Sequence, residues 1–132
     1  MTRIPAVSRN RTIVYWVTTV ILAGELGVGG VLDILQHPYV REIVERLGYP
    51  AYVTVILGVW KLPGAVVLLV PRFPRLKEWV YAGMVFNFTG AVASHLIVGD
   101  YSLGLVGAIQ FIVLVAVSWA LRPSDRRALA PS

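Results

Sequence analysis

Four long apolar runs dominate the chain, and they cover about residues 12–35, 52–70, 79–98 and 103–121. An α-helix needs roughly 20 apolar residues to cross the hydrocarbon core of a bilayer. Because each run has about that length, the pattern predicts an all-α protein, a transmembrane four-helix bundle. The polar stretches between the runs are too short to hold a second core, so we expect residues 1–132 to form a single membrane domain.

The longest polar connection, residues 36–50, contains a further helical pattern. Between residues 40 and 47 apolar residues recur at helical spacing, with charged residues between them. This segment predicts a short amphipathic helix that lies at the outer surface of the membrane.

The basic residues indicate how the chain is oriented. If the four runs span the bilayer, Arg41 and Arg46 lie on one side, and nine Lys and Arg residues lie on the side of the termini: Arg3, Arg9, Arg11, Arg72, Arg75, Lys77, Arg122, Arg126 and Arg127. Lys and Arg concentrate in cytoplasmic loops. We therefore predict cytoplasmic termini and a multi-pass protein of a bacterial inner (plasma) membrane. The unequal number of basic residues on the two sides also argues against the small dual-topology multidrug exporters, because those proteins need almost equal numbers on both sides.

Composition agrees with the membrane class, since 57% of the residues are hydrophobic and 14% are charged. The net charge of +5 lies in short flanks of the apolar runs, without interleaved aromatic residues, so we expect no nucleic-acid partner. The chain has no cysteine, which excludes disulfides and iron–sulfur clusters. Electron chemistry would need a partner. The expected partners are the lipid bilayer, a membrane or redox protein, and a second copy of the chain.

Polar residues interrupt three of the apolar runs near their centres. Glu25, Lys61 and Asn87 each lie within a residue or two of the middle of a run. Ionisable groups at this depth are costly unless they are paired, and they are therefore functional candidates. On each predicted helix, small residues lie on the same face as the polar residue, and such residues are typical of contacts between helices in lipid. We expect all three to face inward, with Glu25 balancing Lys61; the alternative is a purely structural pair that fixes helix register.

A second polar level lies closer to the outer face. Asp33 and His95 follow Glu25 and Asn87 by eight residues each, which places them roughly 12 Å farther out. We expect His95 to bond to Asp33 or to a backbone carbonyl and to bind no metal, because no cysteine or second histidine is in reach. The predicted ligand-binding cavity is lined by Glu25, Asp33, Lys61, Asn87, Ser94, His95 and Gln110.

Several segments between about residues 15 and 100 resemble, in order, the DoxX-like family of small four-helix bacterial membrane proteins. They are LGYPA at 47–51, LGVWKL at 57–62, VPRFPRLKEW at 70–79 and TGAVASHL at 89–96. The resemblance implies a four-helix inner-membrane bundle, a recurrent lysine on the second helix, and a role beside quinone-linked or other membrane oxidoreductases. Asn87 stands where members often carry an acid, so we expect Glu25 to supply that charge.

Three functions remain open at this point. The first is an accessory or small-lipophile-binding subunit of a membrane redox or stress-response system. The second is a small membrane enzyme, with Glu25 or His95 as general acid/base and Lys61 and Asn87 stabilising charge. The third is a proton or solute pathway, disfavoured because the cytoplasmic half offers few polar residues. No cofactor is evident from the sequence; a quinone or another lipophile is the ligand class that we expect.

Overall fold

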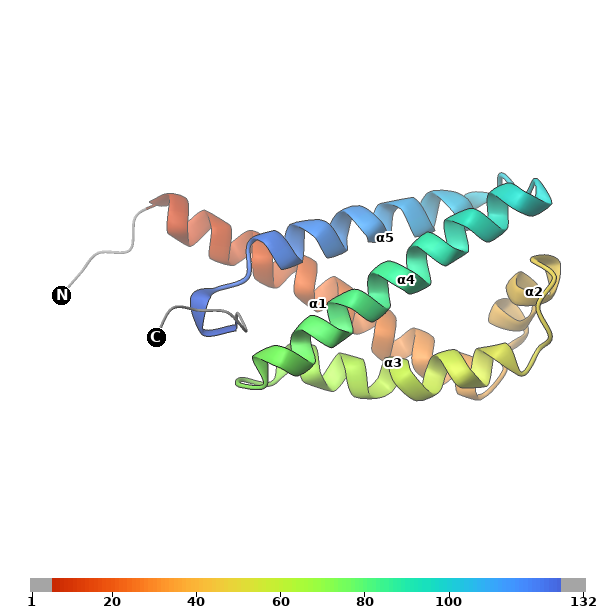
Figure 1. The fold of residues 1–132 in the computed structure, drawn as a ribbon, viewed down its shortest axis with the longest axis horizontal. Coiled ribbons are helices and arrows are strands. Elements are labelled where there is room, and N and C mark those ends of the chain that lie inside the picture. The colour runs from red at the N-terminus through yellow and green to blue at the C-terminus, as the bar shows by residue number, and fades with distance from the viewer. Residues whose placement is uncertain (1–5, 127–132) are drawn as a thin grey trace.

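The computed structural model describes residues 6–126, and in this part of the chain every regular element is a helix (Figure 1). The helices are α1 (Ala6–Ile34), α2 (Pro38–Arg46), α3 (Val53–Leu69), α4 (Pro74–Val98) and α5 (Leu103–Ala120), followed by the 3-10 helix η1 (Ser124–Arg126). The all-α prediction is confirmed, and α2 lies where the amphipathic pattern predicts a helix.

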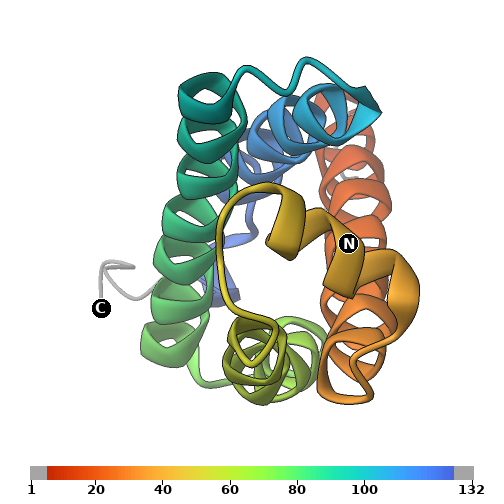
Figure 2. The same ribbon diagram turned by 90° about the vertical axis from the view of Figure 1, so that its right-hand side faces the viewer.

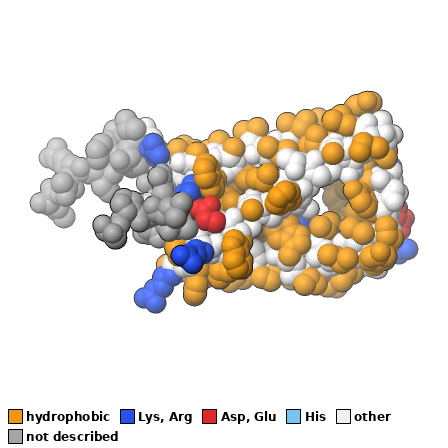
Figure 3. Space-filling model, in the orientation of Figure 1, with side chains coloured by type: hydrophobic (Ala, Val, Ile, Leu, Met, Phe, Trp, Pro, Cys, Tyr) orange, Lys and Arg blue, Asp and Glu red, His pale blue; other side chains and the backbone are white. Residues whose placement is uncertain are grey.

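Three of the helices are long and apolar enough to cross a membrane: Arg9–Ile34 within α1, α4, and α5. The apolar run predicted over residues 52–70 forms α3, which is shorter at 17 residues. Large apolar side chains cover the outside, and Phe86, Ile97 and Leu103 are 77%, 84% and 85% exposed. Hydrophobic groups predominate on the visible face of the bundle (Figure 3). Such a surface suits contact with lipid rather than water.

The four long helices surround a common centre, and α2 lies across one end (Figure 2). We call the end with α2 and the α4–α5 turn the α2 end, and the opposite end, where the described chain begins and finishes, the terminal end (Figure 1). Helix α1 packs closely on α3, α4 packs on α5, and α1 also contacts α5. The contact between α3 and α4 is much smaller, so the bundle is least tightly closed along that seam.

Glycines explain the close packing of α1 on α3. A Cβ added to Gly58 would lie only 2.6 Å from the carbonyl oxygen of Gly30, so the two backbones nearly touch. A Cβ on Gly30 would in turn lie 3.2 Å from the Cβ of Lys61. Small residues permit such approach between helices in lipid. The contact brings Lys61 directly against α1.

Apolar side chains fill the half of the bundle nearer the terminal end. Leu22, Leu26, Leu68 and Met84 have no exposed surface. Beside them three hydroxyl groups form one network: the Ser118 Oγ lies 2.7 Å from both the Thr19 Oγ1 and the Tyr81 hydroxyl. The polar residues of this half are therefore satisfied inside a packed core.

Basic side chains close the terminal end itself. The Lys77 ammonium is buried and donates to the carbonyls of Val70 and Arg72, at 2.6 Å each. Arg72 has a left-handed backbone, with φ 72°, in the turn before α4. The guanidinium of Arg126 is also buried and donates to the Leu68 carbonyl at 2.9 Å. Lys77 and Arg126, two of the nine basic residues used to predict the topology, therefore bind backbone carbonyls at this end of the bundle. Two others, Arg3 and Arg127, lie outside the described residues.

Helix α4 begins at Pro74, ahead of the span predicted from residue 79. Proline is favoured at the first helical position because its missing N–H would have no partner there. The polar residues directly before Trp79 therefore belong to the start of the helix.

Candidate functional site

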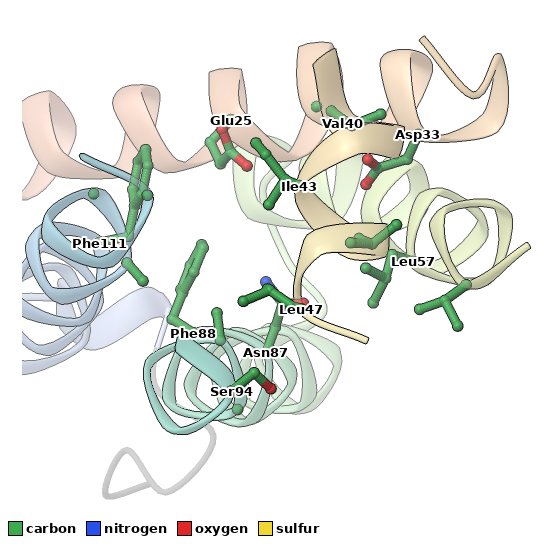
Figure 4. Close-up of a pocket in the computed structure, with 18 of the residues that line it drawn as sticks. Glu25, Asp33, Val40, Ile43, Leu47, Leu57, Asn87, Phe88, Ser94 and Phe111 are labelled. Atoms are coloured by element: carbon green, nitrogen blue, oxygen red, sulfur yellow. The ribbon is translucent and has the colours of Figure 1, made fainter. Parts of the chain in front are cut away.

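A cavity of about 570 Å³ lies between the long helices at the α2 end (Figure 4). All five α-helices contribute to its wall. Most of the wall is apolar: α2 contributes Val40 and Ile43, Leu47 follows directly after α2, and α3 contributes Leu57. Helix α2 has no buried residue of its own, so its apolar side covers the cavity rather than entering the core.

Two stacked aromatic rings separate the cavity from the core. The ring centroids of Phe88 and Phe111 are 5.1 Å apart, and their planes differ by 15°. Along α4 and α5 these residues lie between the hydroxyl network of Tyr81 and Ser118 and the polar residues nearer the α2 end. The cavity therefore ends within the bundle, at this pair of rings.

Lys61 is the central charged group of the cavity. Its side chain is 8% exposed, and its Nζ lies 2.9 Å from the Oδ2 of Asp33 and 3.7 Å from the Oε1 of Glu25. Both carboxylates come from α1 and line the cavity together with the lysine. One ammonium and two carboxylates therefore meet at one wall.

The separation of Asp33 from Lys61 that the sequence predicts is wrong. Side chains on a helix lean toward its N-terminus. Helix α3 begins at the α2 end, whereas α1 finishes there, so Lys61 leans toward the α2 end and Asp33 leans back to meet it. The lysine thereby joins the two expected polar levels, with Asp33 as its nearer partner and Glu25 as the more distant one.

Glu25 and Asn87 lie on opposite sides of the cavity, on α1 and α4 (Figure 4). The Glu25 side chain is 30% exposed, far more than the 5% of Asp33. Among the residues that the structure describes, the Asn87 amide forms no hydrogen bond. A carboxylate beside an ammonium and a free amide opposite can together receive the polar part of a bound molecule.

His95 has a different partner from those that the sequence suggests. It is buried, and its Nδ1 lies 3.2 Å from the Oδ2 of Asp100 in the α4–α5 turn. The guanidinium of Arg46 on α2 lies 3.6 Å from the same oxygen. The prediction that His95 bonds to Asp33 or to a backbone carbonyl is wrong. Lys61 pairs with Asp33 instead, and the turn after Gly99 brings Asp100 back to the histidine.

Asp100 lies outside the helices, in the turn between α4 and α5. Desolvation raises the pKa of its carboxyl, but a hydrogen bond from Ser102 and the nearby Arg46 and His95 outweigh that effect. The pKa of Asp100 is therefore below its ordinary value. This carboxylate links α2 to the end of α4.

Ser94 also connects the cavity wall to the segment after α2. Its Oγ lies 2.6 Å from the hydroxyl of Tyr49. The sequence pattern identifies neither Tyr49 as a partner of Ser94 nor Asp100 as a partner of His95. No spacing rule indicates either contact, because both join segments that are distant in sequence.

Gln110 does not belong to the cavity. Its side chain is exposed, and the lining of the cavity by α5 consists of Leu103, Gly104, Gly107, Ala108 and Phe111. The sequence-based assignment is wrong because it used only the depth of Gln110 in the bilayer. A residue at the right depth on the opposite side of its helix cannot reach the centre.

No group of three or more His, Cys, Asp or Glu residues in the described part of the chain is placed to hold a metal ion. The six remaining predicted site residues do line the cavity: Glu25, Asp33, Lys61, Asn87, Ser94 and His95. Their arrangement suits an organic ligand with an apolar body and a polar group.

Comparison with known proteins places the chain in a family. No curated protein and no solved structure matches it. A family model described as the DoxX-like family matches residues 17–120, which include all of the residues that line the cavity. The chain therefore belongs to the DoxX-like family of membrane proteins.

Proposed function

We propose that this DoxX-like protein is a lipophile-binding accessory subunit of a membrane redox or stress-response system. In this proposal α3 is the fourth transmembrane span, the protein lies in a bacterial inner membrane, and both termini are cytoplasmic. The apolar character of α3 and its close packing along α1 support the fourth span. The cations at the terminal end support the orientation.

The observation that carries the binding function is the cavity at the α2 end. Its volume of about 570 Å³ lies within the range of roughly 300–1,000 Å³ that is usual for small-molecule sites. Its walls are mostly apolar, and its charged groups converge at Lys61. A molecule with a ring or chain and a polar head, such as a quinone, would match that distribution.

The surroundings of the charges support binding over a purely structural role. A structural ion pair is stabilised when neighbouring groups fill the space and complete its hydrogen bonds. Glu25 instead stands beside an unfilled cavity, with the Asn87 amide across from it. These groups are available to a ligand.

The test is native mass spectrometry of the protein in lipid nanodiscs, with a decyl-substituted benzoquinone added as probe. We expect one probe per chain for the parent and for Arg75→Met, which removes an exposed cation outside the cavity. Lys61→Met should weaken retention by about tenfold. Because that variant leaves Asp33 without its ammonium, Asn87→Leu provides a second test: it reduces the cavity without breaking an ion pair. The proposal would be contradicted if all four proteins retained the benzoquinone equally, or if none of them retained it.

A membrane enzyme is the second candidate, and the partly exposed Glu25 carboxylate favours it. Glu25 lies within reach of both the cavity and Lys61, as a general acid or base must. Under this alternative, Glu25→Gln would keep the ligand but leave it chemically unchanged, whereas the parent would convert it. Mass spectra of the ligand recovered after incubation distinguish the two functions.

A further inference from the structure

A second hollow lies outside the cavity, between α3 and α4. It is lined by Leu57, Trp60, Trp79, Gly83, Phe86 and Asn87. Three of these residues, Leu57, Phe86 and Asn87, also line the cavity, so the two spaces share a wall. The face that α4 crosses is visibly hollowed toward the α2 end (Figure 3). We call the outer space the α3–α4 groove.

We propose that a single-chain lipophile enters the cavity sideways from the bilayer through the α3–α4 groove and leaves its alkyl chain there. We further propose that its head group is neutral or cationic, such as a quinone, a hydroxyl or an amine, and not an anion. Both statements rest on the proposed function, because they assume that the cavity binds a lipophile.

The packing of α3 and α4 supports the lateral route. The contact between these helices is small, although both face lipid. At their crossing α4 carries Gly83, and a Cβ there would lie 3.5 Å from the Trp60 ring, so the absence of a side chain leaves the groove open. Trp79 and Phe86 are 71% and 77% exposed at its edge. An alkyl chain would therefore contact mainly apolar groups along this path.

The charges at the cavity wall support the choice of head group. Lys61 lies closer to Asp33, at 2.9 Å, than to Glu25, at 3.7 Å. Glu25 is therefore the less compensated and the more exposed of the two carboxylates that line the cavity. An anionic head would meet two carboxylates and an ammonium that is already paired, and like charges at such distances are unfavourable. A hydroxyl or ammonium head would instead donate to Glu25.

Other groups nearby do not reverse this preference. The guanidinium of Arg46 pairs with Asp100 at 3.6 Å, and Asp100 also contacts His95. Asn87 lines both the groove and the cavity, and its amide can donate to or accept from a head group that passes it. Amide recognition is compatible with a neutral head.

The experiment uses tryptophan quenching by brominated alkyl chains, since bromine quenches an indole only at contact. Trp60 is kept as the single tryptophan by changing Trp16, Trp79 and Trp119 to Phe, and circular dichroism checks that this variant remains helical. The protein is reconstituted in phosphatidylcholine nanodiscs and titrated with bromododecyl amine, alcohol and carboxylate at equal bilayer mole fractions. We expect saturable quenching by the amine and the alcohol, and at least about tenfold weaker quenching by the carboxylate.

Variants test the route and the charge separately. Gly83→Leu fills the groove and should weaken saturable quenching by about tenfold. Gly24→Leu is the matched control, because a Cβ on Gly24 meets no atom within 4 Å, and it should behave like the parent. Gly83→Ala, which adds only an ordinary contact with Trp60, should give an intermediate loss in a folded protein. Glu25→Gln should remove most of the discrimination against the carboxylate.

The outcomes separate this inference from the function on which it rests. Equal quenching by Gly83→Leu and the parent would overturn the lateral route. Equal binding of carboxylate and amine by the parent would overturn the head-group preference. No saturable quenching by any probe, with the benzoquinone still retained in mass spectra, would overturn the groove while the proposed function stands. The loss of both signals would overturn both.

Discussion

The two halves of this bundle bury charge in different ways. At the terminal end, Lys77 and Arg126 are surrounded by backbone carbonyls, and a packed core lies behind them. At the α2 end, Lys61 meets carboxylates beside a cavity of about 570 Å³. Burial of a basic side chain is therefore not a sign of function in itself. The unfilled space and the second carboxylate distinguish the α2 end.

The largest effect should come from breaking the Lys61–Asp33 pair. Lys61→Met leaves a buried carboxylate without its ammonium, and we expect a loss of about 3–5 kcal/mol in the free energy of unfolding. Adding Asp33→Asn should recover much of that loss, whereas Glu25→Gln should recover less because its carboxylate is more distant and more exposed. Chemical denaturation in detergent micelles measures these values. Equal recovery by the two changes would contradict the order of the partners.

The next largest effect should come from Gly58→Ala at the contact between α1 and α3. The new methyl group would lie 2.6 Å from the Gly30 carbonyl oxygen, which cannot move without shifting the backbone. We expect a loss of about 1–3 kcal/mol in the free energy of unfolding and weaker probe binding, because Lys61 would be displaced. The matched control is Gly24→Ala, which faces open space. If the two variants unfold alike, close packing of α1 on α3 does not position the lysine.

A smaller effect should come from Ser118→Ala in the terminal half. This change removes the shared partner of Thr19 and Tyr81, and we expect a loss of about 0.5–1.5 kcal/mol in the free energy of unfolding. Binding of the benzoquinone should stay unchanged, because the Phe88–Phe111 stack separates the network from the cavity. Thermal unfolding and native mass spectrometry of the same sample check both statements. A loss of binding would show that the halves are coupled.

The smallest effect concerns the attachment of α2 and its dependence on pH. The pKa of Asp100 lies below its ordinary value of 3.8 in the folded chain, so its stabilising contribution is present above that value and is lost as the pH falls through the folded pKa. In the parent protein, hydrogen exchange in α2 should therefore become faster as Asp100 is protonated at acid pH. Asp100→Asn should already show fast exchange in α2 at neutral pH, and acid should cause no further increase. Glu42→Gln, on an exposed residue of α2, is the control. Unchanged exchange in Asp100→Asn would mean that this carboxylate does not hold α2.

The sequence by itself determined the class of the protein and much of its outline. Apolar runs of nearly constant length predicted the long helices, and the amphipathic pattern between residues 40 and 47 predicted α2, because both follow from local periodicity and the energetics of lipid. The residues that resemble the DoxX-like family identified the family correctly. The cost of an ionisable group in an apolar run also drew attention to Lys61 and Glu25.

Only the tertiary structure decided which polar groups meet. Depth along a helix follows from counting residues, but contact also depends on helix rotation, helix direction and side-chain reach. For that reason Asp33 lies beside Lys61, His95 lies beside Asp100, and Gln110 faces outward. The cavity is likewise a property of packing: glycines bring α1 onto α3, while α3 and α4 stay loosely joined, and the remaining side chains leave the space beneath α2 unfilled.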